Sequence, residues 1–244
     1  MEFTKNDETI IIGVDEAGRG PLFGDVYTSA VILPNDSFDL TCLKDSKKFT
    51  SKKKIKQVYD YIKTQNTIYS IDSCTHEEID TYNILQATQK SMHKSIRNVI
   101  KQYIDSLSSY SSDVFDNLFI CVDGNYFNDF LYFHEDSFYK IKHQCFIKGD
   151  DLYKSISAAS ILAKVERDLY IDTLLETYPD YEEKYKLSKN KGYGTKQHLD
   201  GIRLYGYSAH HRKSFKVKSI IAQPEHISQV PSVSLSEAGS CDNV

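Results

Sequence analysis

The sequence predicts an α/β protein whose sheet is covered by helices and followed by a helical C-terminal part. Short apolar runs rich in β-branched residues recur along the chain as expected strands. Between them lie longer stretches with apolar residues at helical spacing. The chain has 244 residues, 40% of them hydrophobic, which allows one large domain with a sizeable core or two small ones. Strands alternating with helices favour the α/β class.

The first half supplies three expected strands and two expected helices. Strands at 10–15 and 25–33 flank a glycine-rich turn, and the second stops at Pro34. Ser51 is a candidate cap for a helix to about residue 63, and a short strand near 67–72 follows. Thr75, with Glu78 three residues later, forms a capping-box pattern that opens a largely helical region to about residue 105.

The second half begins with a buried strand at 118–122 that ends at an Asp-Gly pair. We expect residues 124–142 to be aromatic and irregular, and 144–147 to form a last strand that ends at Gly149-Asp150. The strongest helix prediction runs from Ser155 to about Tyr178, with another helix over 195–205. The long helix has one mostly small face, made of Ile156, Ala159, Ser160, Ala163 and Arg167.

The two ends differ from the body in composition. Residues 1–9 are acidic and polar, which is not the pattern of a secretory signal, and we expect them to be disordered. From residue 217 the composition turns polar, which predicts a disordered tail over 217–244 and leaves 10–216 as the domain. No apolar run approaches the roughly 20 residues needed to span a membrane. Five scattered cysteines, with no CxxC pair, indicate a reduced, cytoplasmic protein.

Basic residues are concentrated in two segments, although the net charge is −4. Residues 44–56 hold seven lysines against Asp45, and 184–218 hold ten Lys or Arg against Asp200. Each segment alone is equally consistent with a solvated helix face. Two basic patches on a neutral body can also bind a polyanion through phosphate contacts.

Three expected strands end in acids: Asp15-Glu16, Asp123 and Asp150. Strand ends at one sheet edge are where α/β enzymes gather ligand sites. Clustered carboxylates repel one another unless cations occupy the site, and Mg²⁺ prefers oxygen ligands. Two ions about 4 Å apart are the design of a phosphodiester hydrolase.

Each acid also has a plainer interpretation. Asp15-Glu16 and Asp123-Gly124, taken singly, fit polar turns better than a site. Asp150 or Asp151 could cap the long helix. Asp168, in the middle of that helix, fits a structural role better than ligation.

An ordered set of motifs runs from about residue 10 to 216. The motifs are Gly13-Val14-Asp15-Glu16-Ala17-Gly18-Arg19-Gly20-Pro21, Leu43-Lys44-Asp45-Ser46-Lys47-Lys48, Glu78-Ile79-Asp80 with Asn83-Ile84, Val122-Asp123-Gly124-Asn125, Lys148-Gly149-Asp150, Ser157-Ala158-Ala159-Ser160-Ile161-Leu162-Ala163-Lys164-Val165 with Arg167-Asp168, Gly192-Tyr193-Gly194-Thr195 and His211-Arg212-Lys213-Ser214-Phe215. Over these residues the chain resembles prokaryotic-type ribonuclease HII, whose motifs follow the same order, and the ordered set is far more specific than any one of them.

The resemblance implies an RNase H-like mixed sheet flanked by helices, and a metal-dependent endonuclease. The implied substrates are RNA–DNA hybrids and duplex DNA containing single ribonucleotides, cut on the 5′ side of the ribonucleotide to leave 3′-hydroxyl and 5′-phosphate ends. By position, Asp15, Glu16, Asp123 and Asp150 match the four carboxylates that bind Mg²⁺ or Mn²⁺, with two ions expected.

The resemblance also implies a substrate-binding set. The glycine loop matches the element that reads the ribose 2′-hydroxyl, the tyrosine matches one that packs at the RNA–DNA junction, and the lysines and last arginine match phosphate contacts. The tyrosine has a core alternative, since the chain holds 18 tyrosines. These residues are Gly18, Arg19, Gly20, Lys47, Lys48, Tyr193 and Arg212.

The chain departs from the family pattern in two places. The segment between Asp123 and Asp150 is longer than in many bacterial members, by roughly one extra hairpin or loop, and its aromatic residues fit either core or a substrate-side surface. They are Phe127, Phe130, Tyr132, Phe133, Phe138 and Tyr139. The tail lacks an aromatic pair of the kind that binds a sliding clamp, so we predict no protein partner. The resemblance implies a monomer.

Three alternative classes of protein fit the sequence less well. Ribonuclease HIII usually carries an added N-terminal domain and lacks the Gly-Arg-Gly loop. A dinucleotide-binding protein needs its glycine loop to open a helix, whereas Gly18 and Gly20 here lead into a strand. A non-catalytic nucleic-acid binder has no need of four acids at strand ends.

Overall fold

A six-stranded mixed sheet forms the centre of the molecule, in the order β3-β2-β1-β4-β6-β5. The computed structural model describes residues 9–34, 38–43, 46 and 49–217. The expected disordered segments fall mostly outside them, as do Lys47 and Lys48. The strands are β1 (Ile10–Ala17), β2 (Val26–Ile32), β3 (Ile68–Cys74), β4 (Leu118–Asp123), β5 (Phe130–His134) and β6 (Ser137–Phe146).

Strand direction determines which side chains meet at one edge. β1 pairs parallel with β4, and β4 pairs parallel with β6, whereas β2, β3 and β5 are antiparallel to their neighbours. The carboxyl ends of β1, β4 and β6 therefore lie at the same sheet edge, the usual place for ligand sites in such sheets.

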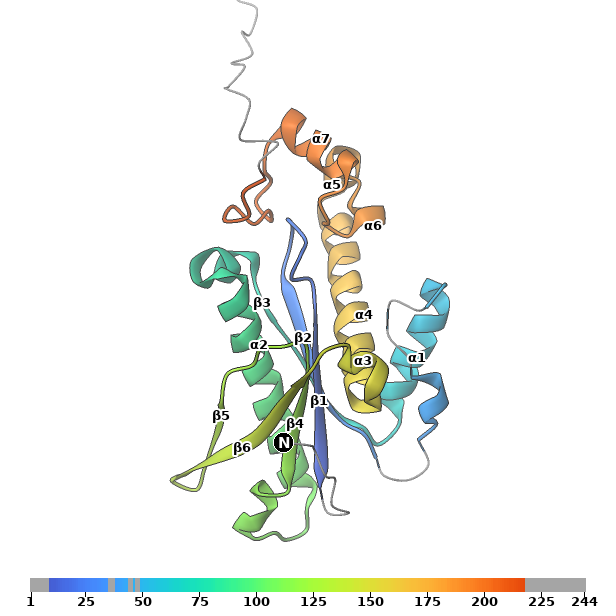
Figure 1. The fold of residues 1–244 in the computed structure, drawn as a ribbon. Coiled ribbons are helices and arrows are strands. Elements are labelled where there is room, and N and C mark those ends of the chain that lie inside the picture. The colour runs from blue at the N-terminus through green and yellow to red at the C-terminus, as the bar shows by residue number, and fades with distance from the viewer. Residues whose placement is uncertain (1–8, 35–37, 44–45, 47–48, 218–244) are drawn as a thin grey trace, which may run out of the picture.

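Helices cover both faces of the sheet (Figure 1). α2 (His76–Ser106) packs on one face against β2 and β3, while α4 (Lys154–Thr177) packs on the other against β1 and β2, beside α1 (Lys52–Thr64). Gly13 allows α4 to lie very close to β1, because a Cβ there would come within 2.2 Å of the Ser155 backbone carbon. The expected mixed sheet with flanking helices is confirmed.

The capping box that the sequence predicts for α2 is present. The Thr75 side chain accepts a hydrogen bond from the Glu78 amide, and the Glu78 carboxylate accepts one from the Thr75 amide. The helix is kinked at Asn83, where φ is 67°. The Asn83 side chain accepts a hydrogen bond from the Gln86 amide and so caps the second part of the helix.

Short helices follow α4 and lie at its far end (Figure 1). Together with Phe23, they form a separate small core. Only the last of the C-terminal helices was expected from the sequence. The remaining helical elements are η1 (Leu40–Cys42), η3 (Ser112–Phe115), α3 (Gly149–Leu152), α5 (Asp180–Tyr185), α6 (Leu187–Asn190) and α7 (Lys196–Tyr205).

The prediction of an irregular 124–142 segment is wrong. Most of it forms the β5–β6 hairpin at one side of the sheet, with Phe133 opposite Phe138. Phe127, Phe130 and Tyr132 are buried in the main core, so part of the aromatic set is core.

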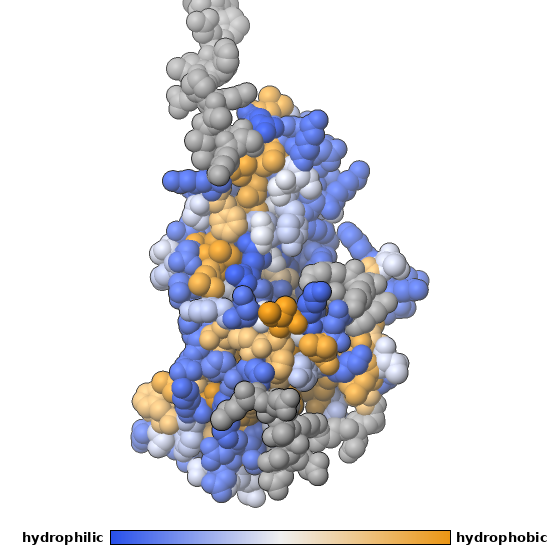
Figure 2. Space-filling model, in the orientation of Figure 1, coloured by the Kyte–Doolittle hydropathy of each residue, from blue (hydrophilic) through white to orange (hydrophobic). Residues whose placement is uncertain are grey.

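The outer part of this hairpin carries exposed apolar side chains: Leu131, Phe133 and Phe138. Figure 2 shows a mostly hydrophilic face with hydrophobic residues near its centre and at its lower left, the side on which Figure 1 places β5 and β6. Within the described part of the chain, no helix has the length and apolar character that a membrane crossing needs.

Candidate active site

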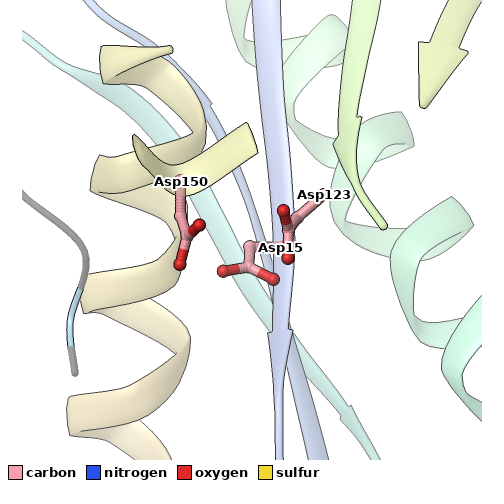
Figure 3. Close-up of side chains that lie close together, drawn as sticks. All are labelled: Asp15, Asp123 and Asp150. Carbon is pink, nitrogen blue, oxygen red and sulfur yellow. The ribbon is translucent and has the colours of Figure 1, made fainter. Parts of the chain in front are cut away.

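Three carboxylates converge where the parallel strands end (Figure 3). Asp15 lies in β1, Asp123 is the last residue of β4, and Asp150 lies in α3, just beyond β6. One oxygen of each can be chosen so that all three lie within 4.8 Å of one another. Asp15 and Asp150 are buried and Asp123 is half-buried. Of the four acids predicted to meet at this edge, the structure brings these three together.

Local hydrogen bonds orient the carboxylates. The Gly149 amide donates to Asp123 Oδ1 over 2.7 Å, which ties the end of β4 to the start of α3. The Glu16 amide donates to Asp15 Oδ1, also over 2.7 Å. Burial, followed by the charges of Glu16 and Asp123, raises the pKa of Asp15 well above its ordinary value, and hydrogen bonds from Ser160 and Glu16 oppose the shift.

Asp150 reaches the cluster by a route that the sequence did not suggest. β6 ends at Phe146, and Asp150 lies in the one-turn helix α3, which follows Lys148 in a left-handed conformation (φ 59°). The alternative of a cap on the long helix is wrong, because α4 begins after Tyr153 and has no side-chain cap there. Asp168 pairs with Lys164 one turn away on α4, as a structural acid would.

Glu16 lines the same cleft without belonging to the three-carboxylate cluster. A side-chain oxygen of Glu16 accepts a hydrogen bond from Arg19 Nη1 over 3.3 Å. The cleft, of about 260 Å³, joins the cluster to the glycine-rich loop and to Tyr193. It is lined by Asp15, Glu16, Ala17, Gly18, Arg19, Gly20, Ser46, Asp123, Ser160, Lys164, Arg167 and Tyr193.

Arg212 does not face this cleft, so the predicted phosphate contact is wrong. Its side chain is fully buried behind the glycine-rich loop. The guanidinium donates to the carbonyls of Gly18 (2.7 Å), Arg19 (3.1 Å), Pro21 (2.8 Å) and Gly24 (2.7 Å). Burial, with Arg167 next, lowers the pKa of Arg212 to about 9, so the group stays charged at neutral pH.

Arg167 is a second buried arginine that holds the same region. It donates to the carbonyls of Asp25, Lys191 and Phe23 over 3.0–3.1 Å. Gly18, with φ of +96°, leaves room for it, because a Cβ there would lie 2.1 Å from Arg167 Nε. Sequence reasoning missed this role. The available signal was one large cation on the otherwise small face of the long helix.

Tyr193 lies beside the glycine-rich loop. Its side chain is 51% exposed, so the core alternative is wrong. A Cβ placed on Gly20 would lie 3.5 Å from Tyr193 Cε1, which puts the ring next to that loop. The loop and the ring thus occupy one wall of the cleft, beside the carboxylates. Lys47 and Lys48, the other predicted contacts, fall outside the described residues.

The cluster fits hard divalent cations. The three carboxylates form an oxygen-only donor set of the kind Mg²⁺ and Mn²⁺ take. Burial first, and the neighbouring Glu16 and Asp123 carboxylates second, raise the pKa of Asp15, so an ionised Asp15 is unfavourable there unless a bound cation offsets these effects. Such a cation, when bound, supplies Lewis-acid activation of water and of a phosphoryl oxygen.

Fold and site together define a protein of ribonuclease H-like fold with a candidate divalent-metal site at the carboxyl edge of its sheet. Among solved structures, a chain of the PCNA–RNase HII complex from Archaeoglobus fulgidus is similar, with a TM-score of 0.59 and 18% identity, over 86% of this chain and 96% of that one. The ribonuclease H2 of Pyrococcus horikoshii is similar at a TM-score of 0.57 and 21% identity, over 84% and 93%. At these identities the likeness concerns the fold.

Sequence similarity identifies the family. The family model described as ribonuclease HII matches residues 12–218. Ribonuclease HII of Rickettsia canadensis is 41% identical over 218 residues, 89% of this chain and 95% of its own length. That of Christiangramia forsetii is 40% identical over 212 residues, 87% and 93% of the two chains. The chain belongs to the ribonuclease HII family. It is therefore a ribonuclease H, a divalent-metal-dependent hydrolase that acts on nucleic acid.

We expect Asp15→Asn to stabilise the metal-free protein while removing its response to metal. An ionised carboxylate whose pKa is raised by folding costs stability at every pH above its ordinary range, near 4. Loss of the charge should raise the free energy of unfolding of the metal-free protein by about 1 kcal/mol or more at neutral pH, which is roughly 2–4 °C in Tm. Thermal unfolding with EDTA, and then with Mg²⁺ or Mn²⁺, measures both effects.

In the same melts, metal at ten times its Kd should stabilise the wild type by about 1.4 kcal/mol. Asp116→Asn, an exposed acid before β4 at the opposite sheet edge, should respond to metal as the wild type does. An Asp15→Asn protein that melts lower than the wild type in EDTA would contradict the repulsion argument.

Proposed function

We propose that the protein incises duplex DNA on the 5′ side of single ribonucleotides and cleaves the RNA strand of RNA–DNA hybrids, leaving 3′-hydroxyl and 5′-phosphate ends. The observation that carries the proposal is the single cleft in which the carboxylate cluster, the Gly18-Arg19-Gly20 loop and Tyr193 adjoin. A scissile phosphate at the carboxylates would place the adjoining sugar beside the loop, so cutting and sugar selection are properties of one site.

The glycine-rich loop is proposed to read the ribose 2′-hydroxyl through its backbone. That hydroxyl both donates and accepts hydrogen bonds, and it is what distinguishes RNA from DNA at one position. Arg212 supports such a reader, because it engages the carbonyls of Gly18 and Arg19 and so fixes the loop backbone before substrate arrives. A preformed loop discriminates better than one that must order on binding.

Tyr193 is proposed to pack on the nucleotide at the RNA–DNA junction. An exposed aromatic ring beside a site that handles sugars can stack on a sugar or base. Its neighbours Gly192 and Gly194 keep the backbone around it compact, with φ of +88° at Gly192. Lys47 and Lys48 are proposed phosphate contacts on the strength of the sequence alone.

We propose two divalent ions, Mg²⁺ or Mn²⁺, held by Asp15, Glu16, Asp123 and Asp150. Three of these carboxylates already converge, and Glu16 lines the same cleft. All four come from one chain, which supports a monomer as the active species.

The decisive experiment is incubation with duplex DNA that contains one ribonucleotide, in the presence of Mg²⁺ or Mn²⁺. We expect one cut, on the 5′ side of that ribonucleotide, and no cut in the same duplex made entirely of DNA. End analysis should give a 3′-hydroxyl and a 5′-phosphate. Absence of incision with either metal, while a uniform RNA–DNA hybrid is cleaved, would restrict the function to hybrids.

A further inference from the structure

Two buried histidines lie directly behind Tyr193 and take no part in the proposed chemistry. His198 lies in the first turn of α7, and His211 lies in the C-terminal segment, where it forms a β-bridge with Phe23. Both side chains are fully buried. Their Nε2 atoms are 3.0 Å apart, a hydrogen-bonding distance.

The partners at the two ends determine where each proton lies. The Tyr193 carbonyl, 2.9 Å from His198 Nδ1, can only accept, so His198 carries its proton on Nδ1. The Ser208 amide, 2.9 Å from His211 Nδ1, can only donate, and the Ser208 hydroxyl, 2.8 Å from the same atom, can donate as well, so His211 carries its proton on Nε2. All hydrogen bonds in the chain therefore donate in the same direction: the Ser208 amide to His211, His211 to His198, and His198 to the Tyr193 carbonyl.

This arrangement needs both rings neutral, and their surroundings keep them so. Phe23, Tyr185 and Tyr207 pack edge-on against His211, and Tyr185 also packs against His198. Burial lowers the pKa of His198, and burial with the nearby His198, His210 and His76 lowers the pKa of His211 to about 3. The chain of hydrogen bonds is thus a fixed connection at working pH.

Arg212, which follows His211 in the chain, holds the glycine-rich loop. Arg212 holds the carbonyls of Gly18, Arg19 and Pro21, while His211 reaches Tyr193 through His198. One dipeptide is therefore connected to both proposed substrate-binding elements, the glycine-rich loop directly and Tyr193 through one imidazole. A shift of either residue would change the spacing between the loop and the ring.

We infer that His198 and His211 are positioning residues that set the place of Tyr193 relative to the Gly18-Arg19-Gly20 loop. The inference rests on the proposed role of Tyr193 at the ribonucleotide junction. The histidines touch neither substrate nor metal, and they act on cleavage only through Tyr193.

Two replacements of His198 separate its two hydrogen bonds. The amide of His198→Asn can donate to the Tyr193 carbonyl but does not reach His211. His198→Gln reaches His211 but loses the donor to Tyr193. We expect His198→Asn to keep kcat/KM for DNA with one ribonucleotide within about threefold, and His198→Gln to lose roughly five- to tenfold, the effect of one hydrogen bond.

A double-mutant cycle tests whether the effect passes through Tyr193. Tyr193→Ala alone should lower kcat/KM, and adding His198→Gln to it should lower kcat/KM by less than about twofold further. If the two losses multiply in full, His198 has a general structural role and the inference is overturned. If Tyr193→Ala cleaves as the wild type does, both the junction role of Tyr193 and the inference are overturned. The proposed nuclease function is tested separately, by incision with the wild-type protein.

Nitrogen-15 NMR of the histidine-labelled wild type tests the arrangement without any substitution. At neutral pH we expect His198 in the Nδ1–H form and His211 in the Nε2–H form. An imidazolium at either position, or the opposite tautomer, would overturn the inference even if the variants fail to fold.

Discussion

Asp123→Asn is expected to abolish cleavage while leaving binding of RNA–DNA hybrid intact. The substitution keeps the size of the side chain and its acceptor oxygen for the Gly149 amide, 2.7 Å away, so the end of β4 stays in place. It removes one of the three charges that converge at the sheet edge. Metal-assisted hydrolysis depends on several kcal/mol of charge stabilisation, so we expect a loss in kcat of about 10³-fold or more.

Binding should not suffer, because the lost charge repels phosphate. Filter binding or fluorescence anisotropy in EDTA should give a Kd for the variant equal to or below that of the wild type. Asp116→Asn, at the other end of the same strand, is the matched control and should cleave normally. Cleavage by Asp123→Asn within tenfold of the wild type would remove this residue from the metal site.

The cluster could be predicted from the sequence because it depends on local patterns and a general rule. Each strand is a short apolar run, and Asp15 and Asp123 lie at or near the carboxyl ends of two of them. Parallel strands bring such ends to one edge. Asp150 lies in the cluster as predicted, but it does not lie at a strand end. The left-handed residue Lys148 and the short helix α3 bring it there, and the sequence did not indicate either.

Residues whose role depends on distant packing could not be predicted in this way. An arginine in a basic segment resembles a phosphate contact, and nothing within that segment reveals that Arg212 is enclosed by residues 18–24. The His198–His211 pair joins two elements in the same way. The strands of the β5–β6 hairpin could not be placed from the sequence, because its turn, Glu135-Asp136, adopts positive φ without glycine and gives no ordinary turn signal.

Replacing Arg212 should have the largest effect on stability, and it should also lower activity. Arg212→Met fills similar volume but leaves the carbonyls of Gly18, Arg19, Pro21 and Gly24 without their donor. A buried acceptor without a partner costs about 1–3 kcal/mol, and partial relaxation of four such groups should leave a loss of about 3–5 kcal/mol in the free energy of unfolding. Urea unfolding measures it, with the neighbouring exposed Lys213→Met as the matched control.

The effect on activity separates loop positioning from stability alone. At a temperature where Arg212→Met is fully folded, a displaced loop should still lower kcat/KM on the single-ribonucleotide duplex by roughly 10²-fold. Arg212→Lys keeps the charge, but one ammonium cannot span the four carbonyls that the planar guanidinium reaches, so we expect only partial rescue of stability and activity. Full activity in the folded Arg212→Met protein would show that the loop keeps its shape unaided, and that this buried arginine serves the fold but not the site.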